Sequence, residues 1–382
     1  MARATTLRDI EAPPEADRLD GVPHPRQTNV IFGHGQAEET LAQSFAGGRM
    51  HHGWLLAGAE GIGKATLAYR FARHALSLPG ERDPSGRTLH VAAETTAARQ
   101  VLALSHPGLL VVRRPWDAKA KRHPTSIPVD EVRRIRPFLA HTAEAGAHRV
   151  VIVDQADELN ASAANALLKS LEEPPAATVF LLVTSEPGRL LPTIRSRCRT
   201  LDMKPLGEAD LRRATFEAFK TIDRDAPGPG DWPRLIALCE GSVRRLLMLW
   251  LGNGLELGER VDRLIGTLPR IDWNGVHALG DELGSAASAE KFEMFFDLLL
   301  QALARLIRAR ARGVTGSPQA ELAGRLIPEA RLATWAELWE TVVREKSVAM
   351  SLNLDRKSLI LDTFSRIEQA ARGVEPRPGS LA

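Results

Sequence analysis

The chain has little cysteine, no long apolar run and almost no net charge. Only two of its 382 residues are cysteine, which excludes a four-cysteine zinc site or a disulfide framework and points to a reducing compartment. No stretch of about 18 consecutive apolar residues occurs, so we expect no membrane-spanning helix. The N-terminus has no apolar segment of the signal-peptide type, and we therefore expect a cytoplasmic protein. A formal charge of +3 neither requires nor excludes a nucleic-acid partner.

Length and composition divide the chain into four parts. At roughly 100–200 residues per domain, a chain of 382 residues allows two or three domains. Residues 1–27 are polar and contain four prolines, which predicts a flexible leader. Residues 28–205 alternate strand and helix patterns, which predicts an α/β domain with a parallel sheet. The strand patterns then stop, and we expect a small helical domain over 206–270 and an all-helical domain over 271–382.

Short apolar runs predict the strands of the sheet, because parallel strands are buried on both faces. The predicted strands are 54–57, 109–112, 149–153 and 179–183. Helical spacing predicts helices over 65–78, 129–142 and 161–172. In the last domain a packed helix is predicted by the spacing of Phe292, Phe296, Leu299, Leu303 and Leu306.

The segment from Gly58 to Lys64 has the spacing G-x-x-x-x-G-K, between a predicted strand and a predicted helix. Gly58, Gly61 and Gly63 allow backbone N–H groups to surround phosphate oxygens, and the helix N-terminus adds positive potential. Lys64 supplies a full charge for the β- and γ-phosphates. The pattern predicts a loop that binds ATP or ADP; the alternative is a glycine turn before a helix.

The residue after the lysine departs from this pattern. A Ser or Thr hydroxyl at this position usually holds Mg²⁺, but the chain has Ala65. Thr66 is adjacent, although a shift of one residue turns a helical side chain by about 100°. We therefore expect phosphate binding, and the sequence leaves Mg²⁺ binding open.

A second nucleotide motif follows the predicted strand 149–153. Asp154 has the position of a Walker B aspartate, which orients Mg²⁺ through water, although an ordinary acidic strand end is the alternative. Gln155 occupies the place of the glutamate that activates water, and an amide cannot accept a proton. Ala65 and Gln155 together predict a site that binds nucleotide without hydrolysing it.

A basic loop over 113–122 holds five Lys and Arg residues around Trp116. It has the charge to contact DNA phosphates. Solvated loop charge is the simpler interpretation, and we favour it.

Several segments resemble one protein family. Residues 165–175, with the sequence NALLKSLEEPP, resemble a signature of bacterial clamp-loader subunits, and so does Ser196-Arg197-Cys198. The start of that family is similar to 31–34 and 49–54, and its delta-prime branch in DNA polymerase III is similar to 105–107, 127–130 and 353–358. These motifs are specific in combination and weak individually. The resemblance covers nearly the whole chain from residue 28.

The resemblance implies an AAA+ P-loop domain over 28–205, a lid domain over 206–270 and a helical collar for oligomerisation over 271–382. It implies a non-motor subunit in a hetero-oligomeric ring with delta and gamma or tau subunits. Such a ring loads the sliding clamp onto primed DNA in DNA replication. The family's ATP-hydrolysing members, gamma and tau, have the hydroxyl and the carboxylate that are missing here.

The resemblance also assigns three side chains. Arg197 would be an arginine finger that reaches the γ-phosphate of ATP on a neighbouring subunit, where a guanidinium stabilises transition-state charge. Thr184 would be a polar sensor in the chain's own pocket, and Arg244 a sensor arginine, with Arg245 as a competing candidate. The alternatives are local ion pairs for Arg197, a strand-end turn for Thr184 and an exposed helix position for Arg244.

Many family members carry a four-cysteine zinc module between the two nucleotide motifs. Residues 78–110 contain no cysteine, so we expect neither zinc nor another metal-ligand cluster. Helix packing through Val101, Leu102 and Leu104 is our prediction for what replaces the module.

Two other functions stay open. The chain could be an active ATP-hydrolysing subunit of the gamma or tau type, in which Thr66 and Asp154 suffice to hold metal. It could also be an unrelated P-loop protein of regulation or DNA repair.

Overall fold

The computed structural model describes residues 14–140, 148–222, 224–352 and 354–373. It divides into two compact units, Met1–Leu247 and Met248–Ala382. The predicted domain boundaries after residues 205 and 270 stay predictions.

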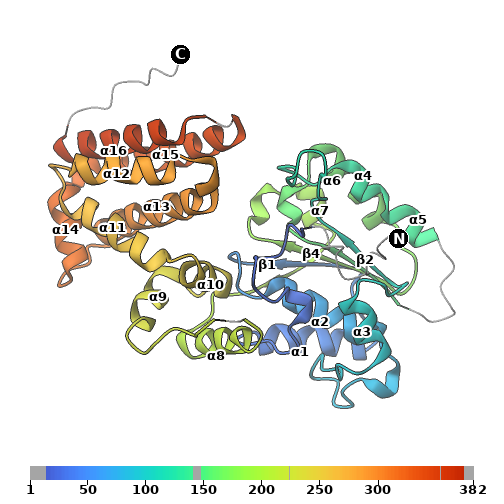
Figure 1. Cartoon of the computed structure of the whole chain (residues 1–382). Helices are drawn as coiled ribbons and strands as arrows, with labels where there is room; N and C mark the ends of the chain where they lie inside the picture. Colours follow the sequence, from blue (N-terminus) through green and yellow to red (C-terminus); the bar gives the residue numbers. More distant parts are fainter. Residues whose placement is uncertain (1–13, 141–147, 223, 353, 374–382) are drawn as a thin grey trace, which may run out of the picture. The chain divides into compact units, whose positions relative to one another are not determined.

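A five-stranded parallel sheet forms the centre of the first unit (Figure 1). Its strands are β1 (Gly53–Ala57), β2 (Leu109–Val112), β3 (Arg149–Val153), β4 (Thr178–Thr184) and β5 (Arg199–Asp202). Their order is β2-β3-β4-β1-β5, and every neighbouring pair is parallel. The predicted α/β class with a parallel sheet is confirmed. The sequence did not reveal β5, because its side chains are largely exposed and no apolar run marks it.

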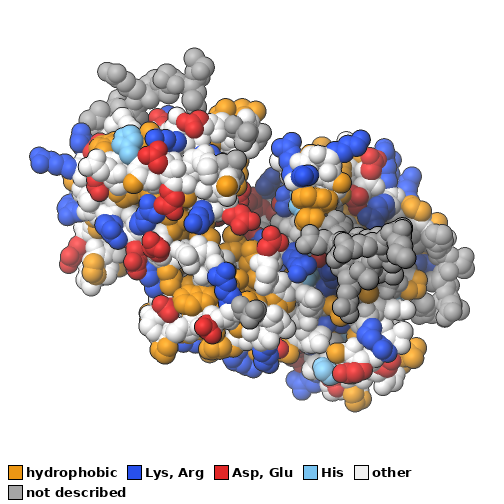
Figure 2. Space-filling model, viewed as in Figure 1, with side chains coloured by type: hydrophobic (Ala, Val, Ile, Leu, Met, Phe, Trp, Pro, Cys, Tyr) orange, Lys and Arg blue, Asp and Glu red, His pale blue; other side chains and the backbone are white. Residues whose placement is uncertain are grey.

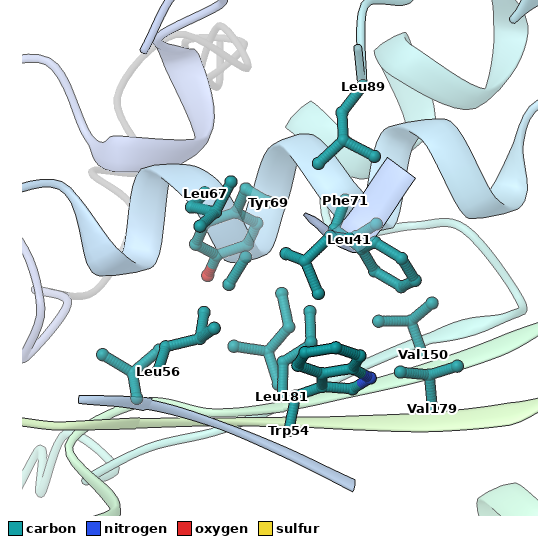
Figure 3. Packing of buried hydrophobic residues seen from close by; sticks show 14 of the residues in the cluster. Leu41, Trp54, Leu56, Leu67, Tyr69, Phe71, Leu89, Val150, Val179 and Leu181 are labelled. Carbon is teal, nitrogen blue, oxygen red and sulfur yellow. The ribbon is translucent and has the colours of Figure 1, made fainter. Parts of the chain in front are cut away.

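Helices cover both faces of this sheet. One face carries α1 (Gly35–Ala46), α2 (Lys64–Leu76) and α3 (Thr96–Leu102), and the other carries α4 (Val129–Arg133), α5 (Ile135–Ala140), α6 (Ala161–Glu172) and α7 (Pro192–Arg195) (Figure 1). Successive strand side chains point to opposite faces, which produces two cores. Trp54 and Leu56 pack with Phe71 of α2 in one core (Figure 3), whereas Leu55 packs with Leu167 of α6 in the other.

The single helix predicted over 129–142 is wrong. The structure has α4, which ends at Arg133, and α5, which begins at Ile135. Pro137 has no N–H to donate to the carbonyl of Arg133, so a continuous helix would lose a hydrogen bond there. Residues 141 and 142 lie outside the described part of the chain.

Three further helices follow the sheet: α8 (Glu208–Phe219), α9 (Trp232–Cys239) and α10 (Val243–Leu251). Short 3-10 turns are Pro25–Gln27, Pro79–Glu81, Ala156–Glu158, Pro187–Arg189, Ala286–Ser288 and Glu329–Arg331. The loop before α9 is fixed by Trp232, which is buried and whose Nε1 donates to the carbonyl of Pro227 at 3.0 Å. The guanidinium of Arg212 on α8 lies 4.6 Å from the centre of the same ring. Trp232 therefore ties α8, α9 and the loop together.

The second unit is helical. It contains α11 (Gly254–Gly266), α12 (Trp273–Leu283), α13 (Ala289–Ala311), α14 (Pro318–Leu326), α15 (Leu332–Leu352) and α16 (Arg356–Arg372). The long α13 contacts α11, α14 and α15. All five side chains of its predicted apolar stripe, from Phe292 to Leu306, are buried. No helix in the described part of the chain has the length and hydropathy to span a bilayer.

The segment between α2 and β2, where the zinc module would lie, is held by polar and apolar contacts. Arg82 Nη2 donates to the carbonyl of Ser77 at 2.6 Å. Val101 is buried and Leu104 packs against the same core, as predicted, but Leu102 is 43 % exposed and the prediction is wrong there. Among the described residues, no group of three or more His, Cys, Asp or Glu side chains is placed to hold a metal ion.

Candidate nucleotide site

The loop between β1 and α2 has the backbone of a phosphate cradle. Gly58, Gly61 and Gly63 have φ values of 149°, 73° and 109°, which favour glycine. A Cβ on Gly58 would lie 2.2 Å from the carbonyl oxygen of Met203. A side chain at this crowded position would displace the loop, so the glycine fixes its shape.

Lys64, the first residue of α2, points back into the loop. Its Nζ donates to the carbonyls of Gly58 and Ala59 at 2.7 Å and 2.5 Å, and to the hydroxyl of Ser185 at 3.1 Å. The residue is only 4 % exposed. Burial lowers the pKa of Lys64 to about 8, against the opposing effect of nearby carboxylates. The ammonium of Lys64 is therefore held in the cradle, where it could donate hydrogen bonds to phosphate oxygens.

The residues after the lysine confirm that a hydroxyl is missing at the usual place. Ala65 and Thr66 both border the cavity in front of the loop, and both are partly buried. The methyl group of Ala65 offers no ligand to a cation. Thr66 carries the first hydroxyl of the helix and borders the cavity, so it stays the candidate to bind Mg²⁺.

Asp154 and Gln155 follow β3 at the same end of the sheet. Asp154 is buried, its backbone N–H donates to the carbonyl of Val112 at 2.9 Å, and its Oδ1 accepts from the N–H of Gln155 at 3.0 Å. Burial, followed by the neighbouring charge of Asp17, raises the pKa of Asp154 to about 8. Gln155 Oε1 accepts from Arg114 Nη2 at 3.4 Å. The position of a general base thus holds an amide.

Two adjacent polar residues end β4. Thr184, the predicted sensor, is fully buried and borders the cavity. Its neighbour Ser185 makes the hydrogen bond to Lys64, and its backbone N–H donates to Asp157 Oδ1 at 3.2 Å. Sequence reasoning missed Ser185. Its position just past the carboxyl end of a parallel strand, where ligands bind in such sheets, was the available signal.

Arg244 is placed at the phosphate loop by the start of α10. Its backbone N–H donates to the carbonyl of Gly61 at 3.3 Å, and its Nε lies 3.2 Å from Glu60 Oε1. Arg244 borders the cavity. Arg245 instead lies 3.9 Å from Glu240, with the distance measured from Nη1 to Oε2. The structure therefore favours Arg244 over Arg245 as the arginine that belongs to this pocket.

Arg197 lies outside this pocket, between α7 and β5. Its Nη1 donates to the carbonyl of Thr193 and its Nη2 to Glu172 Oε1, both at 3.1 Å. The side chain is still 36 % exposed. Figure 2 shows several Lys and Arg side chains on the surface of the first unit around α6. Arg197 is partly exposed and does not border the cavity at the chain's own phosphate loop.

Residues 14–27, which we name the N-terminal strap, pack against the sheet domain. The sequence predicted a flexible leader over 1–27 and did not anticipate these contacts; residues 1–13 lie outside the described part of the chain. Val22 and His24 are buried. Arg113, predicted to carry solvated loop charge, instead forms ion pairs with Glu15 and Asp17 of the strap.

Together these elements border a cavity of about 610 Å³, a size typical of small-ligand sites, which span about 300–1,000 Å³. Its lining comes from the phosphate loop, the ends of β3 and β4, the helices α8 and α10, the strap and the residues just after it, including Val30, Ile31 and Phe32. The predicted residues of the site from Gly61 to Thr66, together with Asp154, Thr184 and Arg244, are brought together here. The arrangement can hold phosphate groups against Lys64 and a flat ring against apolar side chains.

Comparisons with known proteins agree with this geometry. The family model described as DNA polymerase III, delta subunit, matches residues 33–207. The chain is 30 % identical over 334 residues to DNA polymerase III subunit delta' of Escherichia coli (strain K12), covering 86 % of this chain and 92 % of that protein. It is 39 % identical over 163 residues to the delta' subunit of Pseudomonas aeruginosa, covering 42 % and 46 % of the two chains. The DNA polymerase III subunit tau of Salmonella typhimurium is 26 % identical over 317 residues, covering 79 % of this chain and 47 % of tau.

Proposed function

The chain belongs to the delta-prime family of DNA polymerase III subunits, and from that premise we propose that its pocket binds ATP or ADP without hydrolysing it while Arg197 completes the active site of a neighbouring subunit. Within this family it is a non-motor AAA+ subunit of the clamp loader and acts in DNA replication.

The observation that carries the nucleotide proposal is an asymmetry in one pocket. The phosphate cradle and Lys64 are intact, whereas Ala65 has no hydroxyl and Gln155 has no carboxylate. Phosphate binding needs the cradle and the lysine. Hydrolysis also needs a hydroxyl that holds Mg²⁺ and a carboxylate that activates water, and these are the two missing groups. When bound, a nucleotide would place its phosphates against the N-terminus of α2 and its base toward Ile31 and Phe32.

The position of Arg197 supports the proposal of a role in trans. Its guanidinium is partly exposed, is oriented by Glu172 and Thr193, and does not border the chain's own cavity. A guanidinium stays charged and can stabilise charge spread over a transferring phosphoryl group. An oriented, accessible arginine outside its own pocket fits an arginine finger offered to a neighbour.

The partners follow from the family. We propose a hetero-oligomeric ring with delta and gamma or tau subunits, in which this chain supports loading of the sliding clamp onto primed DNA. The second unit, built around α13, is our candidate for the collar that holds the ring together.

The test uses the purified full chain and two measurements. We expect a fluorescent ADP or ATP analogue to bind, Lys64→Ala to abolish that binding, and steady-state release of phosphate to stay at background. Sustained turnover that Lys64→Ala removes would instead support the motor alternative. A pull-down with delta and gamma or tau subunits that recovers none of them would favour an unrelated P-loop protein.

A further inference from the structure

The N-terminal strap forms one wall of the nucleotide cavity. Asp17, Leu19, Val22 and Pro25 border it, as do the phosphate-loop residues from Gly61 to Lys64. The strap and the phosphate loop therefore enclose the same cavity. The strap contributes no residue to the nucleotide motifs, because the cradle, Asp154 and Arg244 lie elsewhere in the chain. Its place at the cavity therefore needs a separate explanation.

One end of the strap is attached firmly. His24 and Gln27 cap the turn Pro25–Gln27 reciprocally, and the His24 ring lies edge-on to Tyr69 of α2, with 5.6 Å between ring centres. Arg26 Nε donates to the carbonyl of Leu102 at 3.0 Å. These contacts fix residues 24–27 to α2 and α3.

The other end of the strap is held by ion pairs. Arg113, just after β2, donates from Nη1 to Asp17 Oδ1 at 2.6 Å and from Nη2 to Glu15 Oε1. Arg26 Nη1 lies 2.8 Å from Glu15 Oε2, and His24 Nε2 lies 3.0 Å from Asp17 Oδ2. Between the two attachments, Gly21 has a φ of 71° and no atom within 4 Å of the place that a Cβ would take, so the chain can turn there.

Arg113 has a specific electrostatic task in this arrangement. The strap brings the carboxylate of Asp17 close to the carboxyl group of Asp154, at the edge of the cavity. Burial, followed by the charge of Asp17, raises the pKa of Asp154 to about 8, so at pH 7 Asp154 is mostly neutral while Asp17 stays charged. The guanidinium of Arg113 is an ion-pair partner of both strap carboxylates, Asp17 and Glu15. Removing its charge takes that partner from both carboxylates and weakens the attachment of the strap.

We propose that the N-terminal strap is a cover for the nucleotide pocket, latched by Arg113, and that bound nucleotide leaves only when this latch opens. This proposal rests on the proposed nucleotide binding and adds that the strap controls the exchange of bound nucleotide. A subunit that does not hydrolyse its nucleotide gains from such a cover a long-lived bound state, which keeps its P-loop and α10 in one arrangement while the ring works.

The experiment measures dissociation of a fluorescent ADP analogue from the full chain after mixing with excess unlabelled ADP. Arg113→Gln is expected to speed dissociation by about tenfold, the effect of losing roughly 1.4 kcal/mol of latch energy. Arg87→Gln is the matched control, because Arg87 forms an exposed ion pair with Glu39 Oε1 at 2.8 Å, neither residue borders the cavity, and exposed pairs contribute little. Its dissociation rate should equal that of the wild type.

A second variant separates the latch from general damage. Glu15→Gln should also speed dissociation, and the double variant with Arg113→Gln should show less than the product of the two effects, because both act through one cluster. In the wild type, hydrogen exchange of backbone amides in residues 14–22 should slow when ADP binds. If nucleotide binds but Arg113→Gln and Glu15→Gln leave both its dissociation and this exchange unchanged, the cover is wrong and the proposed function stands. If the wild type binds no nucleotide, both are overturned.

Discussion

The ammonium of Lys64 donates a hydrogen bond to the hydroxyl of Ser185, with 3.1 Å between Nζ and Oγ. The two residues are 121 positions apart, one opening α2 and the other following β4. Since Ser185 is in turn held by Asp157, the lysine is oriented by the sheet as well as by its own loop. Incoming phosphates would replace these neutral acceptors with charged ones.

This exchange of acceptors predicts that nucleotide binding takes up protons above pH 8. Burial lowers the pKa of Lys64 to about 8, so in free protein at pH 8.5 much of this lysine is neutral. Phosphate charge favours the ammonium and raises its pKa in the complex. Affinity should therefore fall as pH rises above 8. Calorimetry in buffers with different ionisation enthalpies should show proton uptake at pH 8.5 and almost none at pH 7. Buffer-independent heats at pH 8.5 would contradict the assignment.

Restoring the missing groups should restore metal dependence and then turnover. Ala65→Ser places a hydroxyl beside Lys64, and we expect nucleotide affinity to become stronger with Mg²⁺ than with a chelator, unlike in the wild type. Adding Gln155→Glu supplies a proton acceptor, a contribution worth about 10²–10⁴-fold in rate elsewhere. The double variant should release phosphate measurably, and each single variant should not. Thr66→Ala serves as the control: Mg²⁺-dependent binding in the wild type that Thr66→Ala removes would show that Thr66 already holds the metal.

Arg197→Ala should leave ring assembly intact and lower the ATPase of the assembled loader. An arginine finger is worth about 10³–10⁵ in rate at the site that it completes. Arg197→Lys should restore little, because a lysine lacks the planar fork that contacts several phosphate oxygens. Arg195→Ala, which changes an exposed arginine two positions away, is the control and should have no effect. Equal ATPase for complexes with Arg197→Ala and Arg195→Ala would remove the finger assignment.

The sequence predicted the parts of this molecule that depend on local pattern. The apolar runs of β1 to β4 and the glycine spacing of the phosphate loop are visible within a few residues, and the structure confirms both. Pro137 also indicates the break between α4 and α5 in the sequence. The helical spacing of the apolar residues continues across it, however, and this spacing predicted a single helix over 129–142. β5 gave no signal, because an edge strand with exposed side chains has no apolar run.

What the sequence could not reveal are contacts between distant segments. The ion pair of Asp17 with Arg113 joins residues 96 positions apart, and neither belongs to a motif. Composition alone marks the strap as a polar, proline-containing leader. Its charge becomes meaningful only when the folded sheet places the end of β2 beside the end of β3, so that Arg113 and Asp154 both face the same strap.

The contact between the phosphate loop and α10 predicts that Gly61→Ala is severely disruptive. Gly61 has a φ of 73°, and a Cβ there would lie 2.4 Å from both the Cβ of Arg244 and the Oγ of Ser242. The added methyl group would clash with the Cβ of Arg244, at the start of a helix whose backbone is hydrogen-bonded to Gly61. A rotation of the Arg244 side chain does not move its Cβ, so the backbone would have to shift. We expect a loss of about 1–3 kcal/mol in the free energy of unfolding.

Thermal unfolding and binding of the fluorescent ADP analogue check this together. At about 2–4 °C per kcal/mol for a unit of roughly 150–250 residues, the midpoint of the sheet-containing unit should fall by several degrees, and binding should weaken because the loop and Arg244 separate. Gly80→Ala is the matched control, since Gly80 is exposed, does not have a positive φ and leaves at least 4 Å of open space around the place that a Cβ would take. A Gly61→Ala protein with the unfolding midpoint and nucleotide affinity of Gly80→Ala would mean that α10 does not rest on the phosphate loop in solution.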